Sequence, residues 1–455
     1  MQAEIFYQTN SENVLLVTLI SEAHCEQVKE TLSSFERSVM NTQQFKGKYG
    51  ETAFIYSSEG VLSKVLVGGG QGDETLALAS AINRLPPGIY KVSGTISQRT
   101  MVAWSLAQYT FDRYKVSEWA PRVLCVPGDL MNHVLDEANA IYLVRDLINT
   151  PPNHLNPQAL GDALSNLAKK FDAECQQWVG KELLENNFPA IHAVGAASAT
   201  EPRLLSLKWG DPSHPKVTLV GKGVCFDTGG LDLKPASGMR LMKKDMAGAA
   251  HVLGLGQWIM SRNMPIRLQI LIPAVENSVS SQSYRPSDIL TMRNGLTVEI
   301  DNTDAEGRLI LADALVKACE EKPDLVFDFA TLTGAARTAV GTEISAMFTN
   351  ENDLAQELVS CGLEVDDPVW QLPLYKNYES LLLSTVADIS NASPSPYGGA
   401  ITAALFLNKF IQPNISWVHF DIMAWNLATK PGKPEGGEAM GIRAVAQYLS
   451  QRFKS

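Results

Sequence analysis

The chain has 455 residues, 45% of them hydrophobic and 19% charged, which excludes a disordered or fibrous protein and predicts more than one domain. The formal net charge of −11 argues against a general electrostatic attraction to nucleic acid or to anionic lipid. No run approaches the ~20 apolar residues that a membrane-spanning helix needs, so we expect no membrane association.

The six cysteines are scattered along the chain, and none belongs to a C-x-x-C pair. This pattern indicates reduced thiols and no thiolate zinc site. The N-terminus also lacks the basic segment of a signal peptide. We therefore expect a cytoplasmic protein.

Residues 1–130 mix short apolar runs, such as Val14–Val17 and Val65–Val67, with helix-like stretches, and they predict a small N-terminal α/β domain. The glycine-rich tract 68–72 predicts a turn. The next segment, 131–150, has apolar residues at helical spacing and stops before Pro151 and Pro152. It predicts a linking helix between two domains.

Residues 151–455 alternate apolar strands with amphipathic helices, which predicts a larger catalytic domain. We expect a mixed, mostly parallel central sheet flanked by helices, so that the whole chain belongs to the α/β class. The expected strands are 217–220, 268–272, 325–329 and 417–422, and the expected helices are 247–260, 308–319 and 399–410. Active sites of such sheets collect beyond the carboxyl ends of the strands.

The first chemically informative segment, 221–234, directly follows an expected strand. It is rich in glycine and carries Lys222, Asp227 and Lys234, and Asp245 follows at the start of an expected helix. The spacing of neither phosphate-binding nor dinucleotide-binding glycine motifs is present. A nucleotide site is therefore a poor interpretation of this segment.

The second informative segment is Asn302-Thr303-Asp304-Ala305-Glu306-Gly307-Arg308-Leu309, between a strand-like stretch and a helix start. Any one of its acids alone would usually be a helix cap. Together they form a set of charges within apolar, glycine-rich surroundings, where an unpaired charge is costly. Clustered carboxylates are the ligands that oxygen-preferring cations need.

These residues resemble the leucine aminopeptidase family, also called cytosol aminopeptidases or peptidase family M17. The eight residues 302–309 match the family signature NTDAEGRL without a mismatch, and the resemblance covers roughly residues 140–455. The spacing of the charged residues also agrees with the family throughout, at Lys222, Asp227, Lys234, Asp245, Asp304, Glu306 and Arg308.

The resemblance implies an aminopeptidase that holds two divalent cations, with manganese or zinc favoured and magnesium or cobalt still open. One ion would be held by Lys222, Asp227, Asp245 and Glu306, and the other by Asp227, Asp304 and Glu306. Lys222 would ligate as a neutral amine. Two such ions activate a shared water and polarise the scissile carbonyl of a peptide.

The same resemblance assigns catalytic roles to Lys234, as a donor to the developing oxyanion, and to Arg308, as the holder of a bicarbonate-like anion. It implies a preference for N-terminal leucine and similar apolar residues, and a homohexamer. The substrate-binding positions would be Met242, Asn302, Ala305, Thr331, Leu332 and Gly334. Nucleic-acid binding is not indicated, and His419 in an expected strand is interpreted as a structural residue.

Three alternatives stay open at this point. The chain could act chiefly as a scaffold whose N-terminal domain contacts a partner. It could be a dipeptidase with the same chemistry and a shorter substrate channel. A dehydrogenase is the weakest of the three, because the glycine fingerprint of its cofactor site is missing.

Overall fold

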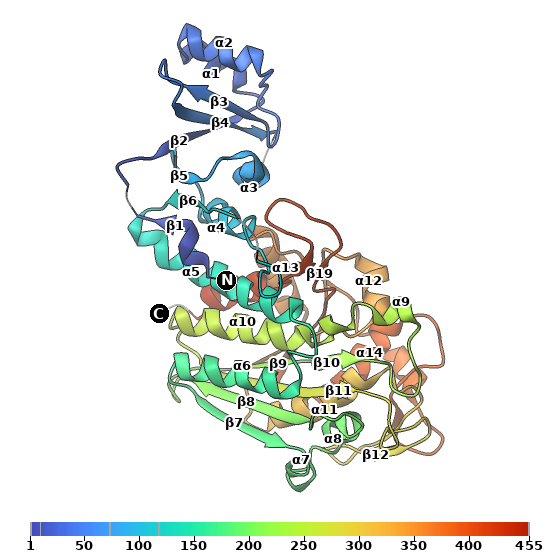
Figure 1. Cartoon of the computed structure of the whole chain (residues 1–455). Helices are drawn as coiled ribbons and strands as arrows, with labels where there is room; N and C mark the ends of the chain where they lie inside the picture. The colour runs from blue at the N-terminus through green and yellow to red at the C-terminus, as the bar shows by residue number, and fades with distance from the viewer. Residues whose placement is uncertain (1, 10, 72–73, 117–118, 454–455) are drawn as a thin grey trace. The chain divides into compact units, whose positions relative to one another are not determined.

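The computed structural model describes residues 2–9, 11–71, 74–116 and 119–453 (Figure 1). The chain forms two compact units, one of Met1–Tyr142 with Asn426–Gly436, and a larger one of Leu143–Trp425 with Gly437–Ser455. The predicted α/β class is confirmed, with a small N-terminal part and a larger C-terminal part. The domain boundaries at residues 130 and 150 stay a prediction.

The first unit contains a six-stranded sheet in the order β1-β6-β5-β2-β4-β3, in which only β3 runs antiparallel to its neighbour. Its strands are β1 (Tyr7–Gln8), β2 (Leu15–Ser21), β3 (Thr52–Tyr56), β4 (Leu62–Gly70), β5 (Gly88–Val92) and β6 (Arg122–Cys125). The helices of this segment are η1 (Ala3–Phe6), α1 (Cys25–Thr31), α2 (Ser34–Thr42), α3 (Ala77–Ala81), η2 (Ile82–Arg84), α4 (Gln98–Leu106) and α5 (Gly128–Asn149), the last of which continues into the second unit.

The turn that we predicted at residues 68–72 is wrong for its first part, because Gly68 and Gly69 lie inside strand β4, which ends at Gly70. A Cβ atom on Gly68 would stand 1.9 Å from the carbonyl oxygen of Lys48. The glycine thus allows a close backbone approach and does not mark a turn. Residues 72 and 73 lie outside the described residues.

The second unit is built on a nine-stranded sheet whose main path runs β16-β15-β18-β14-β9-β11-β8-β7, with β10 paired to β11. The four central strands β18, β14, β9 and β11 are parallel. The strands are β7 (Glu174–Val179), β8 (Arg203–Trp209), β9 (Lys216–Gly221), β10 (Gly223–Asp227), β11 (Arg267–Asn277), β14 (Leu325–Ala330), β15 (Ser345–Thr349), β16 (Val369–Gln371) and β18 (Ser416–Asp421). Smaller sheets contain β12 (Ile289–Thr291), β13 (Thr297–Glu299), β17 (Ile389–Ser390), β19 (Trp425–Asn426) and β20 (Gly436–Gly437).

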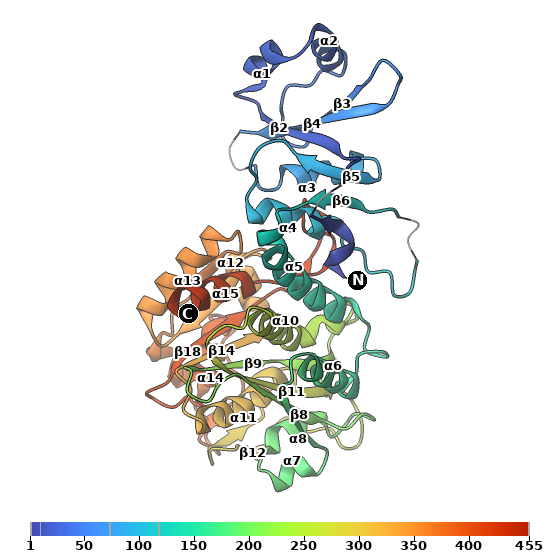
Figure 2. The same cartoon turned by 90° about the vertical axis from the view of Figure 1, so that its left-hand side faces the viewer.

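Helices cover both faces of this sheet (Figures 1 and 2). The helices α6 (Pro157–Lys170) and α10 (Ala247–Ser261) lie on one face, and α8 (Pro189–Gly195) and α11 (Glu306–Glu320) lie on the other. The remaining helices are α7 (Glu182–Glu185), α9 (Ala236–Met239), η3 (Met242–Met246), α12 (Gly334–Val340), α13 (Asn352–Glu364), η4 (Lys376–Leu382), α14 (Gly399–Asn408) and α15 (Ile442–Arg452).

Burial on both faces explains why the central strands read as continuous apolar runs and not as alternating ones. All six residues of β14 are buried, and α10 is buried along almost its whole length. The four strands and three helices predicted in this part of the chain are confirmed, with shifted ends. The antiparallel strands β7, β8 and β15 were not predicted.

No helix among the described residues is both long enough and apolar enough to cross a membrane. None of the six cysteines is paired in the structure, and their reduced state stays a prediction.

Candidate active site

Three buried carboxylates meet beyond the carboxyl ends of the central strands. Asp227 ends β10, Asp245 lies in η3, and Glu306 is the first residue of α11. One oxygen atom from each lies within 4.8 Å of the others, and none of the three residues is more than 3% exposed. So much negative charge in one buried volume requires cations close by.

Lys222 provides one of these cations from the residue after β9. Its Nζ lies 2.8 Å from Oδ2 of Asp245 and 2.9 Å from Oε1 of Glu306. Burial alone would lower the pKa of Lys222, but the surrounding carboxylates outweigh it and raise the pKa. Gly307 makes room for this side chain, because a Cβ atom there would lie 2.5 Å from Cε of Lys222.

Lys234 joins the fourth predicted carboxylate to the other three. Its Nζ lies 2.8 Å from Oδ2 of Asp227 and also forms an ion pair with Asp304. Burial opposes its charge, while Asp227 and Asp304 raise its pKa. The two lysines thus contact all four carboxylates that the sequence singled out.

Burial, together with neighbouring negative charge, makes two of the acids hard to ionise. Burial, followed by the charge of Asp227, raises the pKa of Glu306 from 4.5 to about 8. The same two causes raise the pKa of Asp304 from 3.8 to about 6. Burial would also raise the pKa of Asp245, but Lys222 reverses the effect and lowers it.

This arrangement fits a divalent cation. Oε2 of Glu306 is buried and has no hydrogen-bond donor among the described residues, which leaves it free as a ligand atom. Carboxylate oxygens with one amine suit divalent ions such as Mn²⁺, Zn²⁺ or Mg²⁺. The residues Lys222, Asp227, Asp245, Asp304 and Glu306 could hold such ions.

A frame that the sequence analysis missed holds the two acidic loops together. Asn277 lies at the end of β11 and pairs in register with Asp227. Its side-chain amide donates one hydrogen bond of 2.9 Å to Oδ1 of Asp227 and another of 3.1 Å to the carbonyl of Thr303. The hydroxyl of Thr303 donates 2.6 Å to the carbonyl of Gly229. Asn277 is a polar residue at the carboxyl end of a strand. The tendency of active-site residues to follow such strand ends could therefore have predicted it from the sequence.

The loop after β14 is held from the neighbouring strand. Asp421, at the end of β18, accepts backbone hydrogen bonds from Leu332 at 3.0 Å and Thr333 at 3.1 Å. The hydroxyl of Thr331 donates 2.6 Å to Oδ1 of Asp245, which brings this predicted substrate residue against the acidic cluster. Of the two residues Thr331 and Asp421, only the first was predicted.

Within the described part of the chain, the Arg308 guanidinium contacts a carbonyl and no carboxylate. Its Nη1 donates 2.8 Å to the carbonyl oxygen of Asn391, while its Nε is buried without a partner among the described residues. Burial lowers the pKa of Arg308 to about 10, which leaves it charged at neutral pH. The side-chain oxygen of Asn391 also accepts from the backbone of Asn302, at 3.1 Å, and so fixes the start of the NTDAEGRL segment.

The other predicted substrate positions lie on three elements. Met242 begins η3, Ala305 is the N-cap of α11, and Gly334 begins α12. Asn302 is exposed, and its side chain accepts a hydrogen bond of 2.7 Å from the backbone of Asp304. Beside Met242 the structure reveals a buried cation that was not predicted, Lys244, whose pKa is lowered to about 7 by burial first and then by Arg337.

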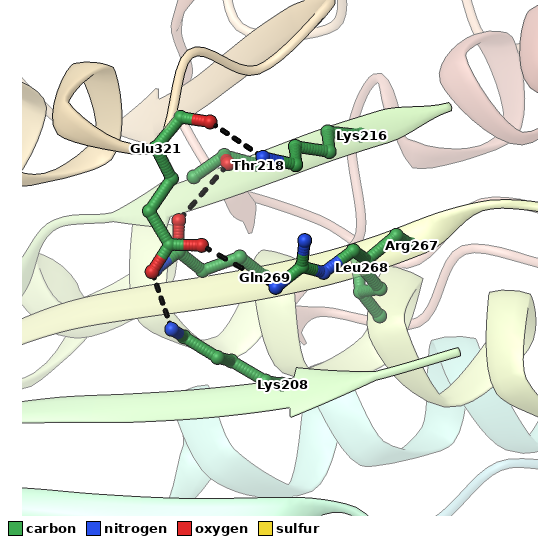
Figure 3. Close-up of a pocket in the computed structure, with 7 residues that line it drawn as sticks. All are labelled: Lys208, Lys216, Thr218, Arg267, Leu268, Gln269 and Glu321. Atoms are coloured by element: carbon green, nitrogen blue, oxygen red, sulfur yellow. Dashed lines mark hydrogen bonds and ion pairs between the residues drawn. The ribbon is translucent and has the colours of Figure 1, made fainter. Parts of the chain in front are cut away.

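A different polar cluster lies at the opposite end of the sheet, around Glu321 (Figure 3). Its carboxylate pairs with Lys208 and lies 3.9 Å from Nη2 of Arg267, and its carbonyl accepts 2.8 Å from Lys216. The cavity between them encloses about 10 Å³, room for one water at most. We interpret this cluster as structural.

His419, which we interpret as a structural residue, lies in the core of the sheet. It is fully buried in β18, and its Nδ1 lies 2.5 Å from Oδ1 of Asp328. The same carboxylate accepts 2.7 Å from the indole of Trp417. Burial would lower the pKa of His419, but Asp328 outweighs it and raises the pKa.

Comparisons with known proteins agree across the whole chain. Residues 142–446 match the model of the cytosol aminopeptidase family catalytic domain, and residues 15–127 match the M17 aminopeptidase N-terminal domain. A probable cytosol aminopeptidase of Pseudomonas fluorescens is 35% identical over 95% of this chain and 94% of its own length.

Solved structures give the same result. A cytosol aminopeptidase from Coxiella burnetii superposes with a TM-score of 0.96 at 44% identity, covering 98% of this chain and 99% of its own. The bottromycin maturation enzyme BotP in complex with Mn superposes with a TM-score of 0.88 at 31% identity, covering 98% of this chain and 100% of its own.

The fold and the two family models define a peptidase, that is, a hydrolase of peptide bonds. The chain belongs to the cytosol aminopeptidase family, and its activity is that of an aminopeptidase.

Proposed function

We propose that this protein is a two-metal aminopeptidase that removes the N-terminal residue of peptides. The observation that carries the proposal is the buried group of Asp227, Asp245 and Glu306, with ligand atoms within 4.8 Å of one another. Manganese is our first choice of metal, because the similar structure of BotP contains it, and zinc is the second.

The chain would hold one ion with Lys222, Asp227, Asp245 and Glu306, and the other with Asp227, Asp304 and Glu306. When bound, the ions would supply an activated water and polarise the scissile carbonyl. Lys222 would have to lose its proton to act as a ligand, which a nearby dication would favour. The ligands carry four carboxylates, which balance the charge of two divalent ions.

The remaining residues bind and orient the substrate. Lys234 lies between Asp227 and Asp304 and would donate to the oxygen on which charge develops. Arg308 keeps its Nε without a protein partner among the described residues, which supports its proposed role in holding a bicarbonate-like anion. The loop 331–334, held by Asp421, would present its backbone to the peptide.

A homohexamer and a cytoplasmic location also stay proposals that rest on the resemblance. The preference for leucine has the same basis, but the buried Lys244 and the nearby Arg337 place positive charge close to Met242, which does not favour an apolar side chain.

The test is hydrolysis of aminoacyl p-nitroanilides by metal-stripped protein, with Mn²⁺ or Zn²⁺ added back, on a panel that includes leucine and glutamate. We expect metal-dependent release that falls at least a thousandfold in Asp227→Ala, because a shared ligand is removed. Asp353→Ala, an exposed acid of α13, is the matched control and should keep full activity. Metal-independent release, or full activity of Asp227→Ala, would contradict the two-metal proposal.

A further inference from the structure

Two cations beside the acidic cluster lack protein partners. Lys244 is 3% exposed, and within the described part of the chain its ammonium makes no hydrogen bond and no ion pair. The guanidinium of Arg337, half-buried on α12, has no such partner there either. Their charges repel each other. A buried, unpaired charge such as that of Lys244 is costly, so Lys244, with the half-buried Arg337 near it, calls for an anion.

The acids nearby are already engaged. The charges that act favourably on Lys244 are those of Asp245 and Asp421. Asp245 lies 2.8 Å from Lys222 and accepts 2.6 Å from Thr331. Asp421 accepts two backbone hydrogen bonds from the loop after β14, and a third of 2.6 Å from the hydroxyl of Thr333. Neither carboxylate contacts the two free cations.

The two cations lie where the first side chain of a substrate is expected. A Cβ atom on Gly334 would lie 3.7 Å from Nη2 of Arg337. Lys244 follows Met242 by two residues in η3. Gly334 and Met242 are both positions predicted to line the pocket for the N-terminal residue. The predicted pocket for the N-terminal residue therefore has positive charge near Met242 and Gly334, from Lys244 and Arg337.

We propose that Lys244 and Arg337 bind the side-chain carboxylate of an N-terminal glutamate or aspartate, so that the enzyme prefers acidic first residues over leucine. This inference rests on the proposed aminopeptidase function and specifies its substrate class. A guanidinium and an ammonium together match a carboxylate in charge and in hydrogen-bond donors. A lysine or arginine at the substrate N-terminus would be repelled by the same pair.

The experiment compares kcat/KM for glutamyl, aspartyl, leucyl and lysyl p-nitroanilides with Mn²⁺ present. We expect the wild type to cleave the acidic substrates fastest and the lysyl substrate slowest. Arg337→Leu and Lys244→Met should each lower the glutamyl-to-leucyl ratio of kcat/KM at least tenfold, since each removes a charge-assisted hydrogen bond to the substrate carboxylate. Arg337→Lys, which keeps the charge, should retain part of the preference.

Lys243→Met is the matched control. It removes the same charge from the neighbouring residue, but the Lys243 ammonium is held 2.8 Å from the carbonyl of Asn149 and over the ring of Trp425. Its glutamyl-to-leucyl ratio should equal that of the wild type. If Lys244→Met fails to fold, the half-buried Arg337 variants still carry the test.

The possible outcomes separate the two proposals. A wild type that prefers leucine, with ratios unchanged in both charge variants, overturns the acidic preference and leaves the aminopeptidase intact. A second outcome is that leucyl hydrolysis requires added chloride or sulfate in the wild type but not in the variants. This would mean that the two cations hold a small free anion, and it would also overturn the acidic preference. Failure to cleave any substrate with any metal overturns the aminopeptidase proposal itself.

Discussion

Metal affinity should rise steeply with pH, because ions and protons compete for the same ligands. In the metal-free site, Glu306 has a pKa of about 8 and Lys222 has a pKa above its ordinary value. An ion that ligates both must release both protons near neutral pH. Each released proton makes the association constant grow about tenfold per pH unit, so we expect roughly hundredfold growth per unit between about pH 6.5 and 7.5.

The perturbation that tests this reasoning is Glu306→Gln, which keeps the shape of the side chain and cannot carry the linked proton. Its Mn²⁺ affinity should be lower throughout and should grow only about tenfold per pH unit, because Lys222 alone releases a proton. Titration calorimetry at pH 7, in two buffers of different ionisation enthalpy, counts the protons directly. We expect about two for the wild type and about one for the variant.

The control is Glu321→Gln, at the opposite end of the sheet, which should release as many protons as the wild type. An equal number of released protons in the wild type and in Glu306→Gln would refute the link between Glu306 and the metal.

The raised pKa of Glu306 also predicts that the metal-free wild type loses stability as the pH rises from 4.5 to about 8, since the folded protein holds the Glu306 proton more tightly than the unfolded chain does. Glu306→Gln should lack this loss.

Three further variants test the frame of the site and the core. Gly307→Ala should displace Lys222 and weaken Mn²⁺ binding at least tenfold by calorimetry, while thermal denaturation detects a loss of about 1–3 kcal/mol; unchanged Mn²⁺ affinity would argue against a need for glycine. Asn277→Ala, which loses two buried hydrogen bonds, should lower kcat more than it raises KM, and the reverse pattern would contradict a positioning role. Asp328→Asn should cost about 3–5 kcal/mol in urea denaturation and leave Mn²⁺ affinity unchanged. Because the pKa of His419 is raised, the His419–Asp328 pair contributes its full stabilisation to the wild type below pH 6.5. This contribution to the free energy of unfolding should decline as the pH rises further, and Asp328→Asn should show no such decline.

The sequence predicted the central strands well because their burial on both faces leaves long apolar runs. It singled out the carboxylates and Lys222 because charges stand out inside apolar, glycine-rich segments, and the structure brings these residues together. Their role as metal ligands stays a prediction. Strand β7 was missed because three of its six residues are exposed and two of these, Glu174 and Gln176, are polar, so its pattern is weak. Gly68 was misinterpreted because a glycine required by a backbone contact from a distant segment looks like one required by a turn.

The partners of the site residues were harder to predict than the residues themselves. Asn391 is distant in sequence from the NTDAEGRL segment that it holds, and no local pattern links them. Lys243 and Lys244 are adjacent lysines in the sequence, but the first is partly exposed and the second is almost fully buried. Only the folded chain distinguishes them, since a single turn of helix aims adjacent side chains in different directions.

The ion pairs of Lys222 and Lys234 have a consequence for handling the protein. Because the two ammonium groups contact all four carboxylates, the acidic site keeps an internal counter-charge when its ions are removed. Chelation should therefore give a folded apoprotein and not a precipitate. Such a preparation can be loaded with one metal species at a time, which makes a clean comparison of manganese, zinc, magnesium and cobalt in the same batch practicable.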